Sequence, residues 1–205
     1  MNAGPGPSAA TVITTGAGGD ASADARALHA AFELAANALI ERRRDGEFWS
    51  VSCAGEASEF IRINRGRLRQ AGRVLRCDAT VRAVIDGRQA AQRVTLSGRP
   101  DIDVARVADA VSGLRALIDV VPRDPHLSYP EGALRSEARA CRAEPAALEV
   151  ARTVIGEARD QDLVGFVASG TTTRGFADTG GTRHWFETDS TVAYFSLPLP
   201  SGRAV

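Results

Sequence analysis

The sequence predicts an α+β fold: a two-layer domain in which about three helices pack against an antiparallel sheet of hairpins. Segments with helical spacing of apolar residues are grouped apart from segments in which apolar and polar residues alternate, which favours this class over a strict βαβ order. In addition, Asn64-Arg65-Gly66 and Asp86-Gly87 each lie between two alternating segments, as hairpin turns do.

The first half of the chain is expected to contain one helix and five strands. Residues 1–20 are rich in Gly, Ala and Thr, and we expect a disordered tail there, followed by one domain over residues 21–205. A helix is predicted from Ala21 to about Arg44, because Asp45-Gly46 then stops it. Alternation predicts strands over residues 48–53, 60–63, 68–75, 77–85 and 89–96.

The second half is expected to contain two helices and two strands. Asp101 is the candidate N-cap of a helix that runs to about Ile118. Residues 119–144 hold three prolines and little periodicity, so a long loop is predicted. A third helix should begin at Pro145 and end near Arg159. Strands are predicted over residues 163–168 and 183–197, with a turn at residues 178–181 before the last one.

Composition excludes several classes of protein. The 25 basic residues, all arginine, balance 25 acidic residues, so no net field attracts the chain to nucleic acid or to a membrane surface. Nothing approaches the length of a membrane span. Cys53, Cys77 and Cys141 are too few and too scattered for a disulfide framework, which favours free thiols in the cytoplasm.

The first predicted hairpin carries the candidate substrate-binding residues. Arg65, Arg67, Arg69 and Arg73 are spaced by even numbers, so on regular strands they would share one face of the sheet. One interpretation is a solvated face; another is a groove that receives an extended peptide and its carboxylates. Nucleic-acid binding is disfavoured by the zero net charge and by the absence of aromatic residues among these arginines.

No catalytic residue, metal ligand or cofactor site is predicted within the chain. The three histidines lie far apart in the sequence, and His184 and Glu187 would face opposite sides of a strand. Ser169 and residues 171–173 lack a neighbouring base. The glycines at 165, 170 and 175 match neither a dinucleotide fingerprint nor a phosphate loop, so they are interpreted as turn glycines.

Two passages resemble the TldD/PmbA family, of which TldE is the PmbA-type member. The first is Glu59–Gly72, which is similar to a stretch near the start of family members. The second combines residues 162–166, 174–177 and 183–187, in the order of a passage late in the family's first half. Together they span roughly Phe48 to Val205, and order and spacing fit the TldE side better. Asp178, His184 and Phe186 depart from the family's Asn, Asn and His.

The resemblance implies a cytoplasmic protein linked to metallopeptidase activity. The TldD type carries a His-Glu-x-x-x-His zinc motif, whereas in this chain no His is followed by Glu. The implied role is therefore a non-catalytic, TldE-like subunit that helps to bind peptide and pairs with a zinc-bearing TldD-like partner, with no membrane or nucleic acid involved. Two alternatives remain open: a component of a biosynthetic hydrolase acting on small peptide-like conjugates, and a pure protein-interaction module.

Overall fold

The computed structural model describes residues 21–129, 132–140, 144–159 and 161–198, in which three helices and six strands are found. The tail predicted over residues 1–20 lies outside the described residues, as does Cys141. The elements, in chain order, are α1 (Ala21–Ile40), β1 (Glu47–Asn64), β2 (Arg67–Ile85), β3 (Arg88–Leu96), α2 (Pro100–Ile118), β4 (Arg135–Ala140), α3 (Ala147–Glu157), β5 (Val164–Asp178) and β6 (Arg183–Ser196).

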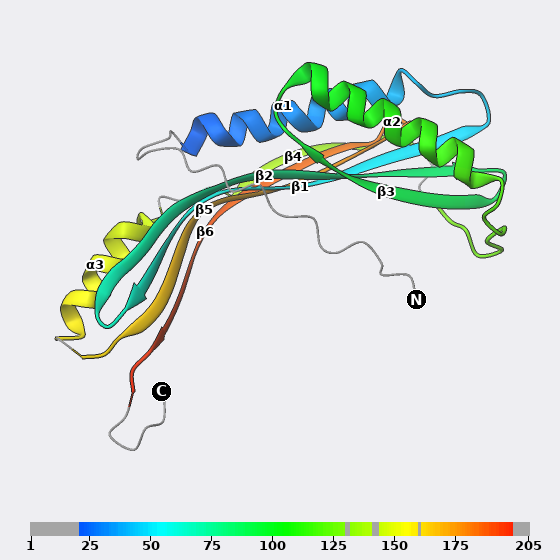
Figure 1. The fold of residues 1–205 in the computed structure, drawn as a ribbon. Helices are drawn as coiled ribbons and strands as arrows, with labels where there is room; N and C mark the ends of the chain where they lie inside the picture. The colour runs from blue at the N-terminus through cyan, green and yellow to red at the C-terminus, as the bar shows by residue number, and fades with distance from the viewer. Residues whose placement is uncertain (1–20, 130–131, 141–143, 160, 199–205) are drawn as a thin grey trace, which may run out of the picture.

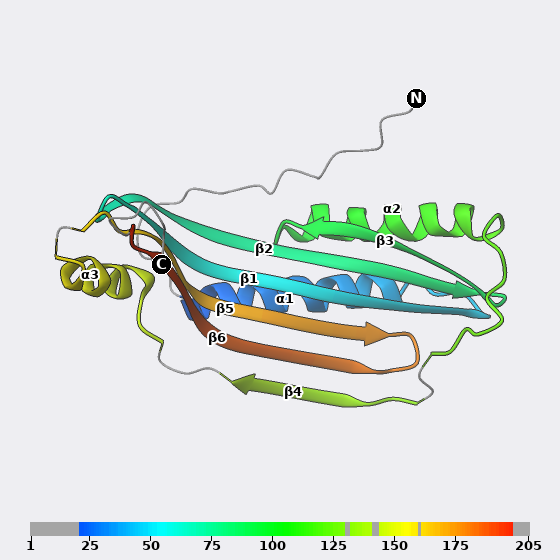
Figure 2. The ribbon, with the colours of Figure 1, turned by 90° about the horizontal axis from the view of Figure 1, so that it is seen from below.

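The six strands form one sheet in the order β3-β2-β1-β5-β6-β4. Neighbouring strands are antiparallel except for β4 and β6, which are parallel. The long central strands bend, and all three helices lie on the convex side, α1 and α2 over one half and α3 at the bent end (Figure 1). The view from below shows the strand order and leaves the concave side free of helices (Figure 2). The predicted fold class, an α+β two-layer domain, is confirmed.

The strands are longer than predicted. Residues 54–59 are mostly small or polar, which suggested a break, yet β1 continues through them because they pair with β2 on one side and β5 on the other. β2 likewise joins two predicted strands, and β5 extends through the polar run at residues 171–173. Backbone hydrogen bonds hold these segments extended whatever their side chains: β1 and β5 have neighbours on both sides, and β2 pairs with β1 at Arg76, where its two predicted strands join.

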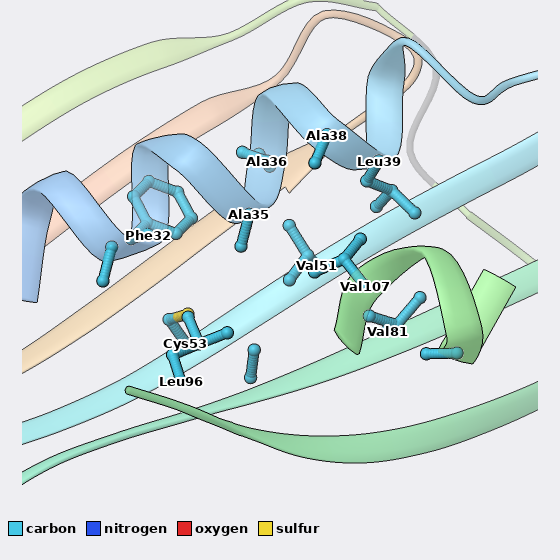
Figure 3. Packing of buried hydrophobic residues seen from close by; sticks show 14 of the residues in the cluster. Phe32, Ala35, Ala36, Ala38, Leu39, Val51, Cys53, Val81, Leu96 and Val107 are labelled. Atoms are coloured by element: carbon cyan, nitrogen blue, oxygen red, sulfur yellow. The ribbon is translucent and has the colours of Figure 1, made fainter. Parts of the chain in front are cut away.

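The larger hydrophobic core lies between the sheet and the first two helices. Phe32 and Leu39 of α1 and Val107 of α2 are buried against Trp49 and Val51 of β1. Several of these side chains are seen together in Figure 3. The helical spacing predicted from the sequence therefore identifies the faces that pack on the sheet.

A second, smaller core lies under α3. Its buried members include Ile61 and Ile63 of β1, Val167 of β5, Leu163 and Ala151. The β1 members of the two cores are all odd-numbered, and alternate residues of a strand point to the same face. Both cores therefore lie on the convex side of the sheet.

Both predicted hairpin turns are confirmed. Arg65 and Gly66 have φ angles of 53° and 63°, and Asp86 and Gly87 have φ angles of 50° and 71°. Two consecutive residues with positive φ are the conformation of the type I′ turn, whose twist matches that of the adjoining strands. Gly supplies this conformation without strain at the second position.

Other predictions need correction. The chain does not continue as helix to Arg44, because α1 ends at Ile40. The N-cap of α2 is Arg99 rather than Asp101, and no side chain caps it by a hydrogen bond. The loop predicted over residues 119–144 contains β4, a fully exposed strand at one edge of the sheet. None of the helices in the described ranges is long and apolar enough to cross a membrane.

Candidate functional site

The concave face carries a row of side chains at the end where α3 covers the opposite face. Arg62 of β1 pairs with Phe166 of β5, which in turn pairs with Tyr194 of β6. Because paired residues point to the same side of a sheet, the three side chains lie next to one another. Phe166 is half-buried, whereas Arg62 and Tyr194 are exposed.

An open groove of about 490 Å³ lies at this row. Strands β1, β2, β5 and β6 all contribute to it, and its polar groups are two guanidinium groups, an amide and two hydroxyls, besides backbone atoms. Its lining residues are Arg62, Ile63, Asn64, Arg69, Val164, Gly165, Phe166, Tyr194, Phe195 and Ser196. No carboxylate side chain is among these residues.

Arg69 reaches the groove because of a β-bulge. Arg62 pairs with Gln70 but the next residue, Ile63, pairs with Leu68, so Arg69 is an extra residue in β2. Such a bulge bends the strand and re-aims a side chain. The geometry thus brings Arg69 of β2 and Arg62 of β1 to the same groove.

Arg62 lies over the aromatic ring of Phe60. Its guanidinium carbon lies 5.9 Å from the centre of the Phe60 ring, within cation–π range. The Phe60 ring in turn stacks on that of Phe166, with 6.1 Å between centroids. Gly72 of β2 makes room for this arrangement, since a Cβ atom there would lie 2.6 Å from the Phe60 ring.

The four arginines proposed from the sequence do not share one face. Arg65 lies in the hairpin turn and Arg69 is the bulged residue. Arg67 pairs with Asn64 on the concave side, while Arg73 lies on the convex side, where it forms an ion pair with Asp24 of α1. The prediction that the four arginines share one face is wrong because the bulge adds one residue to β2. Residues an even number apart on either side of the bulge therefore point to opposite faces.

Arg62 and the other three predicted arginines differ from Arg73, which has an ion-pair partner. Within the described part of the chain, the residues at 62, 65, 67 and 69 have no carboxylate at ion-pair distance. An exposed arginine without an internal partner is free to bind an external carboxylate or phosphate. The groove therefore has the chemistry of an anion-binding site with aromatic walls.

Solved structures with a similar fold are known. TldE from Thermococcus kodakarensis matches with a TM-score of 0.57 and 14% identity, over 87% of this chain and 40% of TldE. The chain shares its fold with part of TldE. A proposed modulator of DNA gyrase from Thermotoga maritima matches with a TM-score of 0.55 and 10% identity, over 83% of this chain and 44% of that protein.

The chain spans less than half of the length of either protein. At these identities the similarity concerns the fold. No protein-family model and no curated protein sequence matches the chain.

Two of the three departures from the TldD/PmbA pattern make local hydrogen bonds, and the third is exposed. Asp178 closes the β5–β6 turn, where its Oδ1 accepts a hydrogen bond of 3.0 Å from the backbone N–H of Thr182. His184 shares a 2.7 Å hydrogen bond with the Ser136 hydroxyl on β4. Phe186 is 42% exposed.

No metal-binding cluster of three or more His, Cys, Asp or Glu residues occurs among the described residues. His29 belongs to α1, and its ring stacks on that of Trp185 with 4.5 Å between centroids. It is not one of the residues that line the groove. The glycines interpreted as turn glycines lie within β5 instead. There they allow close approach: Gly165 to Phe195, Gly170 to the backbone of β1, and Gly175 to Phe32.

Sequence reasoning identified Arg69 but missed Arg62, Phe166 and Tyr194. Arg62 could have been found, because it alternates with the buried residues Ile61 and Ile63 and must face away from them. The two aromatic residues lie more than a hundred positions along the chain, and only the strand pairing brings them to the arginines.

Proposed function

We propose that this chain is a non-catalytic, TldE-like part of a metallopeptidase assembly. It pairs with a zinc-bearing TldD-like partner and helps to hold the peptide that the partner cleaves. The main support is that the sequence passages resembling the TldD/PmbA family and the similarity of the fold to TldE point to the same group of proteins.

The partner's zinc would supply the chemistry, by activating a water molecule and polarising the scissile carbonyl. The residues of this chain would supply binding. The groove holds guanidinium, amide and aromatic groups, which orient a peptide, and none of its lining residues is a nucleophile paired with a base. The buried free thiols of Cys53 and Cys77 fit the reducing conditions of the cytoplasm, where we place the assembly.

The sheet offers surfaces suited to pairing. β3 and β4 are its edge strands, and none of the three helices covers the concave face (Figure 2). Exposed strand edges and faces invite association with another chain. A stable pair would bury about 1,600 Å² or more of surface.

Co-expression with a TldD-like protein from the same organism tests the proposal. We expect the two chains to elute together in size-exclusion chromatography and peptide hydrolysis to occur only in the mixture. Zinc analysis should find the metal in the partner and none tightly held by this chain alone. A variant of the partner with Gln in place of the motif's Glu should keep the complex and lose hydrolysis. Separate elution, with full activity of the partner alone, would refute the proposal.

A further inference from the structure

We infer that the groove lined by Arg62, Arg69, Phe166 and Tyr194 binds the C-terminal end of a peptide whose last residue is aromatic. The two guanidinium groups bind the terminal carboxylate, and the terminal ring lies against the two aromatic side chains. The inference takes the peptide from the proposed function, but the whole binding site is contained in this chain.

The groove carries two positive charges. Arg62 and Arg69 come from two paired strands and line one groove, and no carboxylate side chain lines it. Neither arginine has an ion-pair partner among the residues that the structure describes. Two guanidinium groups without an internal counter-ion favour an anionic ligand, and the guanidinium fork matches the two oxygens of a carboxylate.

The apolar surface is the second argument. Tyr194 is 68% exposed and Val164 is 49% exposed, and both lie beside Phe166 in the groove. Exposed aromatic and aliphatic groups next to arginines mark a place where a ligand, rather than water, completes the packing. A ligand that is anionic at one point and aromatic at another satisfies both halves of the groove.

Size and order are the third argument. A volume of about 490 Å³ is within the range of small-ligand sites, about 300–1,000 Å³. The Phe60 ring lies within cation–π range of Arg62 on one side and stacks on Phe166 on the other, so part of the site is organised before binding. This size fits one terminal residue with its neighbour rather than a long segment.

A nucleotide would also offer an anion and a ring, but the surroundings disfavour a nucleic acid strand. Farther along β1 the same concave face carries Glu56, which is held by Ser58 and is not paired with an arginine in the described residues. The chain as a whole has zero net charge. A strand of nucleic acid is favoured by a continuous basic track, whereas on this face the carboxylates of Glu56 and Asp78 lie among the arginines.

Titration calorimetry of the whole chain with three probes tests the inference. The probes are acetyl-Gly-Gly-Phe with a free carboxylate, the same peptide as its C-terminal amide, and acetyl-Gly-Gly-Ala with a free carboxylate. The first should bind at least about tenfold more tightly than either of the others, since a charge-assisted hydrogen bond or an aromatic contact is lost in each. Equal binding of the acid and the amide would overturn the inference.

Substitutions in the groove locate the binding. Arg62→Gln and Arg69→Gln should each weaken binding of the free acid about tenfold, while Arg69→Lys should keep part of it because the charge remains. Arg135→Gln, an exposed arginine on the edge strand β4, is the matched control and should bind as the unmodified chain does. Unchanged binding by both groove variants would contradict the inference.

An oligothymidylate titration completes the test. If this oligonucleotide binds more tightly than the free acid, and if the Arg62→Gln variant no longer binds it, the groove is a nucleic-acid site and the inference is wrong. These titrations use the chain alone, so their failure is distinct from a failure to pair with a TldD-like subunit.

Discussion

The carboxylate of Glu47 joins three parts of the fold at the start of β1. Its two oxygens accept hydrogen bonds from Nε and Nη2 of Arg115 on α2, at 2.8 and 2.6 Å. It also accepts one of 2.8 Å from the indole N–H of Trp49 and one of 3.0 Å from the backbone N–H of Arg44. These contacts, above all the hydrogen bonds with Arg115, lower the pKa of Glu47 to about 2.

Removal of this charge should change the acid stability of the protein. The folded pKa lies below the unfolded value of 4.5, so the stabilisation is complete above pH 4.5 and is lost as the pH falls towards 2. Glu47→Gln should reduce the unfolding free energy at pH 7 by about 2–3 kcal/mol and flatten its decline between pH 4.5 and 2. Urea unfolding across this range measures both effects. An unchanged pH profile in the variant would show that Glu47 does not carry this dependence.

Gly175 keeps β5 close to α1. A Cβ atom at this position would lie 2.7 Å from Cδ2 of Phe32, which is fully buried. Gly175→Ala should therefore force the ring to move and lower the unfolding free energy by about 1–3 kcal/mol. The matched control is Gly156→Ala in α3, where a Cβ atom meets nothing within 4 Å. There the gain in helix propensity should raise the unfolding free energy by up to about 1 kcal/mol. Thermal unfolding of the two variants should shift in opposite directions.

At the scale of elements, Asp103 secures the start of α2. Its buried carboxylate accepts hydrogen bonds from the backbone N–H of Ser97 at 2.7 Å, the Ser97 hydroxyl at 2.8 Å and the backbone N–H of Gly98 at 2.8 Å. Asp103→Ala leaves these donors without their acceptor, and should lower the unfolding free energy by about 1–3 kcal/mol. Asp101→Ala is the control: its side chain is 71% exposed and should matter by less than about 1 kcal/mol. Chemical denaturation distinguishes the two positions, and equal losses would contradict this assignment.

The elements also show which features a sequence can reveal. Helices and hairpin turns were predictable because periodic burial and residues such as Gly66 and Gly87 leave direct signals. β4 was not, because all of its residues are exposed and no alternation of buried and exposed residues marks it as a strand. The bulge was equally hidden, since one extra residue changes parity without changing composition. As a result, the candidate site was predicted only through Arg69.

At the scale of the whole molecule, two cores share one sheet but are separated by a polar zone. Between them, on the convex face, Thr171 donates a 2.6 Å hydrogen bond to Asp189, and the hydroxyls of Ser169 and Thr191 are 2.9 Å apart. Side-chain hydrogen bonds in this zone couple the two cores less strongly than continuous apolar packing would. The α3 end should therefore open independently of the α1 and α2 end.

Hydrogen exchange can test this separation. Leu163, 2% exposed, belongs to the smaller core. Leu163→Ala should remove packing worth about 2–5 kcal/mol locally and speed exchange in α3 and in the adjoining ends of β1 and β5. Protection of α1 and α2 should stay close to that of the unmodified chain. Equal loss of protection at both ends would show that the sheet unfolds as one unit.

The bulge at Arg69 also determines where this chain can change length. Loss of that one residue would restore regular pairing between β1 and β2 and leave every other residue on its present face. Deletion of Arg76 would instead move all residues on one side of it to the opposite face of the sheet. Buried residues of β2, such as Cys77, Ala79 and Val81, would then be exposed if that side were the one to shift. Insertions and deletions among related sequences should therefore gather at the bulge, and the groove should be the part of the sheet most open to change during evolution.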